Sequence, residues 1–136
     1  MTPKQSIEIE CGRRGRGEVV AGCIDLVEGR PVDDQLILAL AGPAALPVLR
    51  GQAGGRGGYW PRVWGARGLL HIWDDRATRA IVQGAVDDSW RVREMICKVA
   101  AAHHVVDALG AVEELRNDPI PRVCAAANRA VVRLTD

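Results

Sequence analysis

Three histidines are the first candidates for chemistry, because an imidazole can ligate a metal ion or act as a general base. His103 and His104 are adjacent, so on a helix their side chains diverge by about 100° and do not chelate one ion together. Asp107 is the one carboxylate at helical spacing from them. His71 lies in an apolar run, which favours a partly buried polar tip. The sequence therefore predicts no metal site and no catalytic histidine.

Paired carboxylates occur at Asp33-Asp34, Asp74-Asp75 and Asp87-Asp88 and suggest acid/base chemistry or cation binding. Each pair stands just before a predicted helix, where capping and the helix dipole favour acidic side chains without any catalytic role. The glycine run 51–58 has an Arg instead of the Lys-Ser/Thr of a phosphate-binding loop, and no predicted strand precedes it. We therefore predict a protein that is not an enzyme and needs no cofactor.

The four cysteines could in principle bind zinc or form disulfides. Their spacings contain no Cys-x-x-Cys pair or similar ligand arrangement. Cys97 and Cys124 fall within apolar helical patterns, where a free thiol behaves as a small hydrophobic group. The expected state is four free thiols, mainly buried.

One short phrase recurs three times along the chain, as Trp60-Pro-Arg-Val63, Trp90-Arg-Val92 and Ile120-Pro-Arg-Val123. The valines lie 29 and 31 residues apart. A repeat of this length is typical of stacked supersecondary units. Apolar residues follow each valine at i, i+3, i+4, i+7 and i+8, which indicates one amphipathic helix per repeat. Second helices are predicted from Asp74 to about 86 and over 105–116, so each unit is an antiparallel helix pair.

The first half of the chain is less regular. Helices are predicted over 16–28 and 35–41, and another begins at Gly42-Pro43. Residues 1–14 are predicted to be a loose N-terminal arm, or an edge segment through the alternating run Ile7-Glu8-Ile9-Glu10. The domain organisation expected from the sequence is a repeat domain over 15–136, with degenerate leading helices at 15–50 and clear repeats at 59–136.

The segments from Asp87 to Arg93 and from Asp118 to Val123 resemble the HEAT-like repeats of bacteria, in which a turn Asp leads into Val-Arg and an Ala/Leu-rich helix. The resemblance covers roughly residues 34–136. It implies an all-α fold, an α-α superhelix of about three to four helix pairs. It also implies a structural ladder between adjacent repeats, formed by turn aspartates and arginines. The residues that match the ladder are Asp87, Arg93 and Asp118, whereas Gly58, Trp64 and Cys124 depart from it.

A solenoid of this kind binds partners through a concave surface lined by its second helices. Superposing the repeats places Arg76 with Asp107 and Gln83 with Glu114 at equivalent polar positions. Mixed charge there suits a protein or peptide better than a polyanion, so the predicted function is a non-catalytic scaffold. Trp60 and Trp64 are i, i+4 neighbours that form either inter-repeat core or an exposed aromatic ledge. The predicted binding residues are Arg76, Arg79, Gln83, Asp107, Glu114, Trp60 and Trp64.

The alternative function is nucleic-acid binding, as in the HEAT-like DNA-alkylation-repair glycosylases. Residues 50–98 contain nine basic and five acidic side chains, a local excess that could follow a phosphate backbone. The formal net charge of +1 argues against nucleic acid or a membrane as the general partner. The acidic start of the chain predicts a cytoplasmic protein. The apolar stripe of the last predicted helix suggests a homodimer through that helix.

Overall fold

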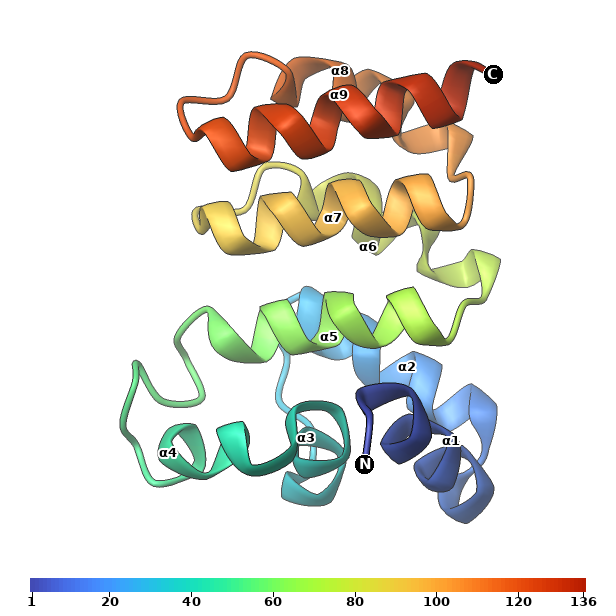
Figure 1. The fold of residues 1–136 in the computed structure, drawn as a ribbon. Helices are drawn as coiled ribbons and strands as arrows, with labels where there is room; N and C mark the ends of the chain where they lie inside the picture. The colour runs from blue at the N-terminus through green and yellow to red at the C-terminus, as the bar shows by residue number, and fades with distance from the viewer. The chain divides into compact units, whose positions relative to one another are not determined.

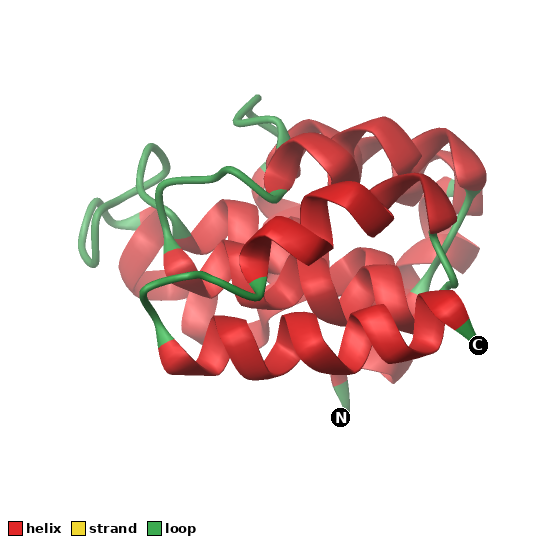
Figure 2. Ribbon diagram, turned by 90° about the horizontal axis from the view of Figure 1, so that it is seen from above, coloured by secondary structure: helices red, strands yellow, loops and turns green.

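The computed structural model describes residues 1–136 and consists of helices and turns, with no strand (Figure 1, Figure 2). The prediction of an all-α protein is therefore confirmed. Contacts divide the chain into an N-terminal unit, Met1–Trp73, and a C-terminal unit, Asp74–Asp136. The division follows Trp73, next to Ile72, whose extended backbone ends the preceding helix. No helix combines the length and apolar character that a membrane crossing requires.

The N-terminal unit contains five α-helices and a 3-10 turn. They are α1 (Pro3–Arg14), α2 (Arg16–Val27), α3 (Asp34–Ala41), η1 (Gly42–Ala44), α4 (Ala45–Leu49) and α5 (Trp60–His71). Helix α5 packs along α2, and α1 packs on both α2 and α3 (Figure 1). The ends of α2 and α3 lie within one residue of the predicted ones. The start of α3 is fixed by Asp33, which caps the helix by accepting a hydrogen bond from the Leu36 N–H at 2.9 Å.

Residues 1–14, predicted as a loose arm, instead form helix α1. Thr2 and Gln5 cap its start reciprocally, with the Gln5 N–H donating to Thr2 Oγ1 at 3.1 Å and the Thr2 N–H donating to Gln5 Oε1 at 2.8 Å. At the other end, Arg14 donates to both oxygens of Asp33, at 2.7 and 2.8 Å, and to buried Glu10 at 2.6 Å. This pairing holds the pKa of Asp33 well below its ordinary value. Capping and the arginine bridge therefore order this segment.

The C-terminal unit is built from two helix pairs in two layers. Its elements are η2 (Asp75–Ala77), α6 (Thr78–Gly84), α7 (Trp90–Ala102), η3 (Val106–Ala108), α8 (Leu109–Leu115) and α9 (Pro121–Thr135). Helices α7 and α9 lie side by side and run in the same direction, with α6 packed behind α7 and α8 behind α9 (Figure 1). Their valines Val92, Val99 and Val123 are fully buried. The helical periodicity therefore predicts the core of this unit correctly.

Candidate interaction surface

The two turns that lead into α7 and α9 have the same local chemistry. Asp87 accepts a hydrogen bond from the Ser89 N–H at 2.8 Å, and Asp118 accepts one from the Ile120 N–H at 2.9 Å. In both cases the carboxylate satisfies a backbone donor two residues ahead, just before the helix begins. Ser89 occupies the N-cap position of α7, but its side chain makes no capping bond. The repeated aspartate is therefore a turn residue in both pairs.

Arg93 on α7 ties the two turns together. Its guanidinium donates to both Asp118 oxygens, Nε at 2.7 Å and Nη2 at 3.2 Å. Nη1 donates to the carbonyl oxygens of Asp87 and Asp88 at 2.9 and 3.1 Å. The structure thus brings Asp87, Arg93 and Asp118 into one network, and the carboxylate that Arg93 contacts is that of Asp118. Burial acts to raise the pKa of Asp118, but the hydrogen bonds outweigh it and the pKa lies below its ordinary value.

A second tie between α7 and α9 was not foreseen from the sequence. Arg122 donates to both oxygens of buried Glu94, with Nε at 2.9 Å and Nη2 at 3.1 Å. Its guanidinium also lies 5.2 Å from the centroid of the Trp90 ring, and that of Arg91 lies 4.6 Å from the same ring. The sequence feature that could have predicted this contact is the arginine that directly precedes the repeat valine in all three copies of the phrase. These contacts fix how α9 lies along α7.

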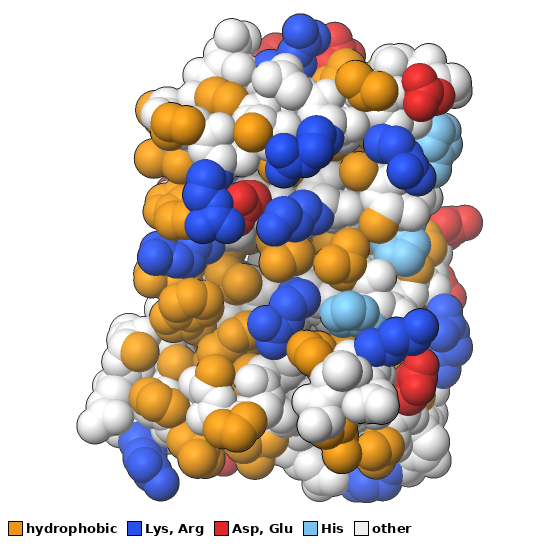
Figure 3. Space-filling model, viewed as in Figure 1, with side chains coloured by type: hydrophobic (Ala, Val, Ile, Leu, Met, Phe, Trp, Pro, Cys, Tyr) orange, Lys and Arg blue, Asp and Glu red, His pale blue; other side chains and the backbone are white.

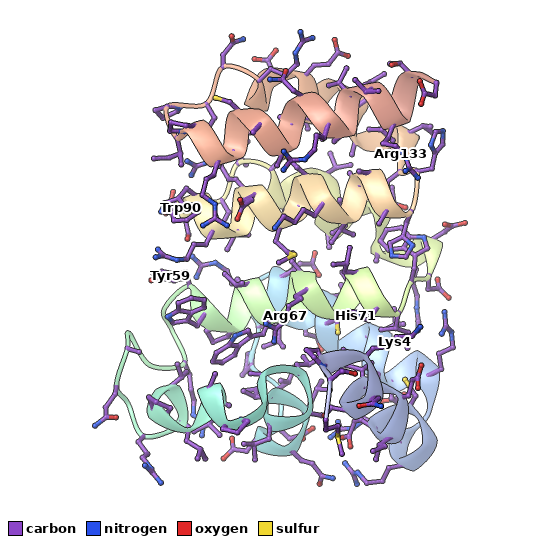
Figure 4. All side chains as sticks on the ribbon, viewed as in Figure 1. Lys4, Tyr59, Arg67, His71, Trp90 and Arg133 are labelled. Atoms are coloured by element: carbon purple, nitrogen blue, oxygen red, sulfur yellow. The ribbon has the colours of Figure 1, made fainter.

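A groove of about 550 Å³ runs between α7 and α9 on the face drawn in Figure 3. Its floor consists of small apolar groups, Ala101 and Ala102 from α7 and Ala126 from α9, and Val132 is 59% exposed beside them. Three basic side chains flank this floor, Lys98, Arg129 and Arg133. Arg133 lies near the C-terminal end of α9 (Figure 4). We call this surface the α7–α9 groove; its residues are Cys97, Lys98, Ala101, Ala102, Ala126, Arg129, Val132 and Arg133.

The predicted binding residues on the second helices are exposed. Arg76 lies beside Asp74, with Nε 3.7 Å from Oδ1, and Glu114 lines a polar hollow between α8 and α9. The exposed members of the predicted set in this unit are Arg76, Arg79, Gln83, Asp107 and Glu114. The apolar groove lies instead on α7 and α9, the first helices of the pairs. A surface with an apolar floor is therefore found on the opposite layer from the one the sequence analysis favoured.

The two tryptophans of the predicted set belong to the N-terminal unit and differ in exposure. Their rings stack with centroids 6.1 Å apart and planes at 21°, as their i, i+4 spacing predicts. Trp64 is only 4% exposed, whereas Trp60 is half-buried and also contacts Tyr59 at 5.0 Å. Trp64 is therefore a core residue of this unit and offers almost no surface to a partner.

The cysteines are all free and do not form a metal site. Cys23 and Cys97 are fully buried, as expected, whereas Cys11 and Cys124 are partly exposed. Burial raises the pKa of both Cys23 and Cys97 to about 12. Their thiols are therefore protonated at neutral pH and are poor nucleophiles.

A basic cluster in the N-terminal unit was not predicted. Lys4 on α1 and Arg67 and His71 on α5 lie next to one another in Figure 4. Arg67 is half-buried and donates to the Leu40 carbonyl oxygen at 2.7 Å. The pKa of His71 lies below its ordinary 6.5, mainly because the imidazole is partly removed from water. The positive charges of Arg67 and Lys4 lower this pKa further. His71 is therefore neutral at physiological pH.

Replacing Lys4 by glutamine is expected to raise the pKa of His71 towards 6.5, because one of the charges opposing its protonation is removed. Because the pKa of His71 is lower in the folded chain than in the unfolded chain, protonation of His71 reduces the stability of the fold as the pH falls below about 6.5. NMR titration of the His71 ring protons, assigned with His71→Gln, measures the shift. Arg50→Gln is the control, and a His71 pKa at or above 6.5 in the unmodified chain would contradict the prediction.

Comparison with known proteins finds no matching family model, curated protein or solved structure. The resemblance to HEAT-like repeats therefore stays a prediction from the residues. Its local support is the pair of equivalent turns at Asp87 and Asp118 and the arginine that joins them.

Proposed function

We propose that the chain is a HEAT-like repeat protein, an α-α superhelix that binds a protein or peptide and performs no catalysis. The C-terminal unit supports this proposal through its repeated turns, its parallel first helices and the Arg93–Asp118 link between successive pairs. Such repeats stack because each pair leaves an apolar side that the next pair covers. A stack of this kind presents long, continuous helix faces on which another chain can lie.

The observation that carries the binding proposal is the α7–α9 groove. Its floor is made of alanines and a valine, so a partner placed there would bury apolar surface. Val132 contributes most to this, because more than half of its surface faces solvent. A groove with small side chains on its floor and long side chains on its rim favours insertion of larger apolar side chains from a partner.

A displayed library of random peptides, selected on the full chain, tests this function. Val132→Glu places a charge in the groove and is expected to weaken selected peptides at least tenfold. Val86→Glu is the matched control, because Val86 is 84% exposed in the same unit and does not line the groove. Circular dichroism checks that both variants stay folded. Failure to select any peptide would contradict the proposed function.

The α6 and α8 surface is the rival site within the same proposal. Peptides that ignore Val132→Glu but are lost on Arg79→Ala or Glu114→Ala would place binding on the second helices. That result would retain the scaffold function and overturn the assignment of the groove.

Nucleic-acid binding is the second candidate, favoured by the basic side chains that flank the groove (Figure 3). Binding to phosphates would be strongly salt-dependent and would need no apolar floor. Retention on heparin at physiological salt, abolished by loss of these basic residues, would support this alternative.

A further inference from the structure

We infer that the α7–α9 groove accepts an amphipathic helix whose apolar stripe is flanked by acidic residues. This inference rests on the proposed function and specifies the chemistry of the partner. It depends on the shape of the groove floor and on the charge of its rim.

The floor suits a helix. Lys98, Ala101 and Ala102 follow helical spacing along α7, and Ala126, Arg129 and Arg133 follow it along α9. The lining of α9 extends over about two turns, or roughly 10 Å. Helices pack about 8–10 Å apart when the side chains at the contact are small, and alanines allow the closer approach. A third helix can therefore lie over α7 and α9 with two or three apolar anchors on the floor.

The rim suits an acidic partner. Lys98, Arg129 and Arg133 are exposed, and none of them forms an ion pair. Other arginines of the same two helices are paired, Arg93 with Asp118 and Arg122 with Glu94. Arg129 and Arg133 are also i, i+4 neighbours, so their like charges repel each other. Carboxylates placed on a partner helix would relieve this repulsion and would steer its approach.

A second copy of this chain is disfavoured as the occupant. An isologous dimer through the groove would bring the same three cations from each copy together without acidic partners. The homodimer predicted through the last helix therefore meets an electrostatic cost at this surface. Static light scattering is expected to show a monomer at micromolar concentration, and a dimer that Val132→Glu dissociates would overturn the assignment of the occupant.

Three synthetic peptides of equal length test the inference on the full chain. They share one leucine and alanine stripe and carry Glu, Gln or Lys beside it. We expect the Glu peptide to bind, the Gln peptide to bind at least tenfold more weakly and the Lys peptide not to bind. Fluorescence anisotropy measures the dissociation constants, and raising the salt from low to high concentration is expected to reduce the difference between Glu and Gln.

A triple variant, Lys98→Gln with Arg129→Gln and Arg133→Gln, is expected to remove the preference for Glu while keeping weak binding of the Gln peptide. The control variant carries Lys4→Gln, Arg30→Gln and Arg50→Gln, which change the net charge equally at exposed positions of the N-terminal unit that do not line the groove. Unchanged preference in the triple variant would overturn the inference.

The outcomes separate this inference from the function on which it rests. Equal binding of Glu and Gln peptides, both lost in Val132→Glu, would keep the groove as a peptide site and overturn the acidic partner. Binding of none of the peptides, together with heparin retention lost in the triple variant, would overturn both and indicate nucleic acid.

Discussion

Replacing Asp118 by alanine is expected to lower the free energy of unfolding of the C-terminal unit by about 3 kcal/mol. The reason is that the Arg93 side chain, 15% exposed, loses its carboxylate partner, which is 4% exposed. The Ile120 N–H at the start of α9 loses its acceptor at the same time. Urea denaturation followed by circular dichroism measures the change as a lower midpoint with an unchanged slope.

The control for this prediction is Asp25→Ala, which removes one of the two acidic partners of Arg30, the other being Glu28. That ion pair is solvent-exposed, at 39% and 56% for the two side chains, so its loss is expected to change stability by less than about 1 kcal/mol. Equal effects of the two substitutions would show that the Arg93–Asp118 link has no special role.

The effect of Asp118 also depends on pH. Its folded-state pKa lies below the ordinary 3.8, so its contribution to stability is complete above about pH 5 and is lost as the pH falls through the folded-state value. The difference between the unmodified chain and Asp118→Ala is therefore expected to shrink below about pH 4. A difference that grows on acidification would contradict this assignment.

Replacing Gly65 by alanine is expected to destabilise the N-terminal unit by about 3 kcal/mol. A Cβ atom at this position of α5 would lie 2.6 Å from Leu26 Cβ and 2.8 Å from the Cys23 carbonyl oxygen, both on α2. Backbone atoms cannot move aside as a side chain can, so α2 and α5 would have to separate. Thermal and urea unfolding measure the loss.

Gly12→Ala is the matched control, because a Cβ at Gly12 of α1 would meet no atom within 4 Å. Alanine is the better helix former, so this variant is expected to be more stable by roughly 0.5–1 kcal/mol. If Gly65→Ala behaved like Gly12→Ala, the close approach of α2 and α5 would be wrong.

The sequence by itself determined which segments after residue 15 are helical and where most of them begin. Asp33 before α3 and Pro121 at the start of α9 act on neighbouring backbone groups, and such local chemistry can be read without a fold. The same holds for the recurring valine, whose burial follows from helical spacing. The segment at Thr2 carried a capping signal as well, but the alternating apolar pattern after it hid the helix α1.

Only the tertiary structure decided which of these residues meet. Arg93 follows Asp87 by six residues and precedes Asp118 by 25, and its choice of the distant carboxylate depends on how α9 packs on α7. Trp60 and Trp64 share one helix face, but the packing of neighbouring helices buries Trp64 and leaves Trp60 half-buried. In the α7–α9 groove, Ala126 is buried, whereas Ala101 is half-buried and Ala102 is exposed, a difference that their residue type does not reveal. Local sequence specifies backbone conformation, whereas burial and ion pairing depend on neighbours that are distant along the chain.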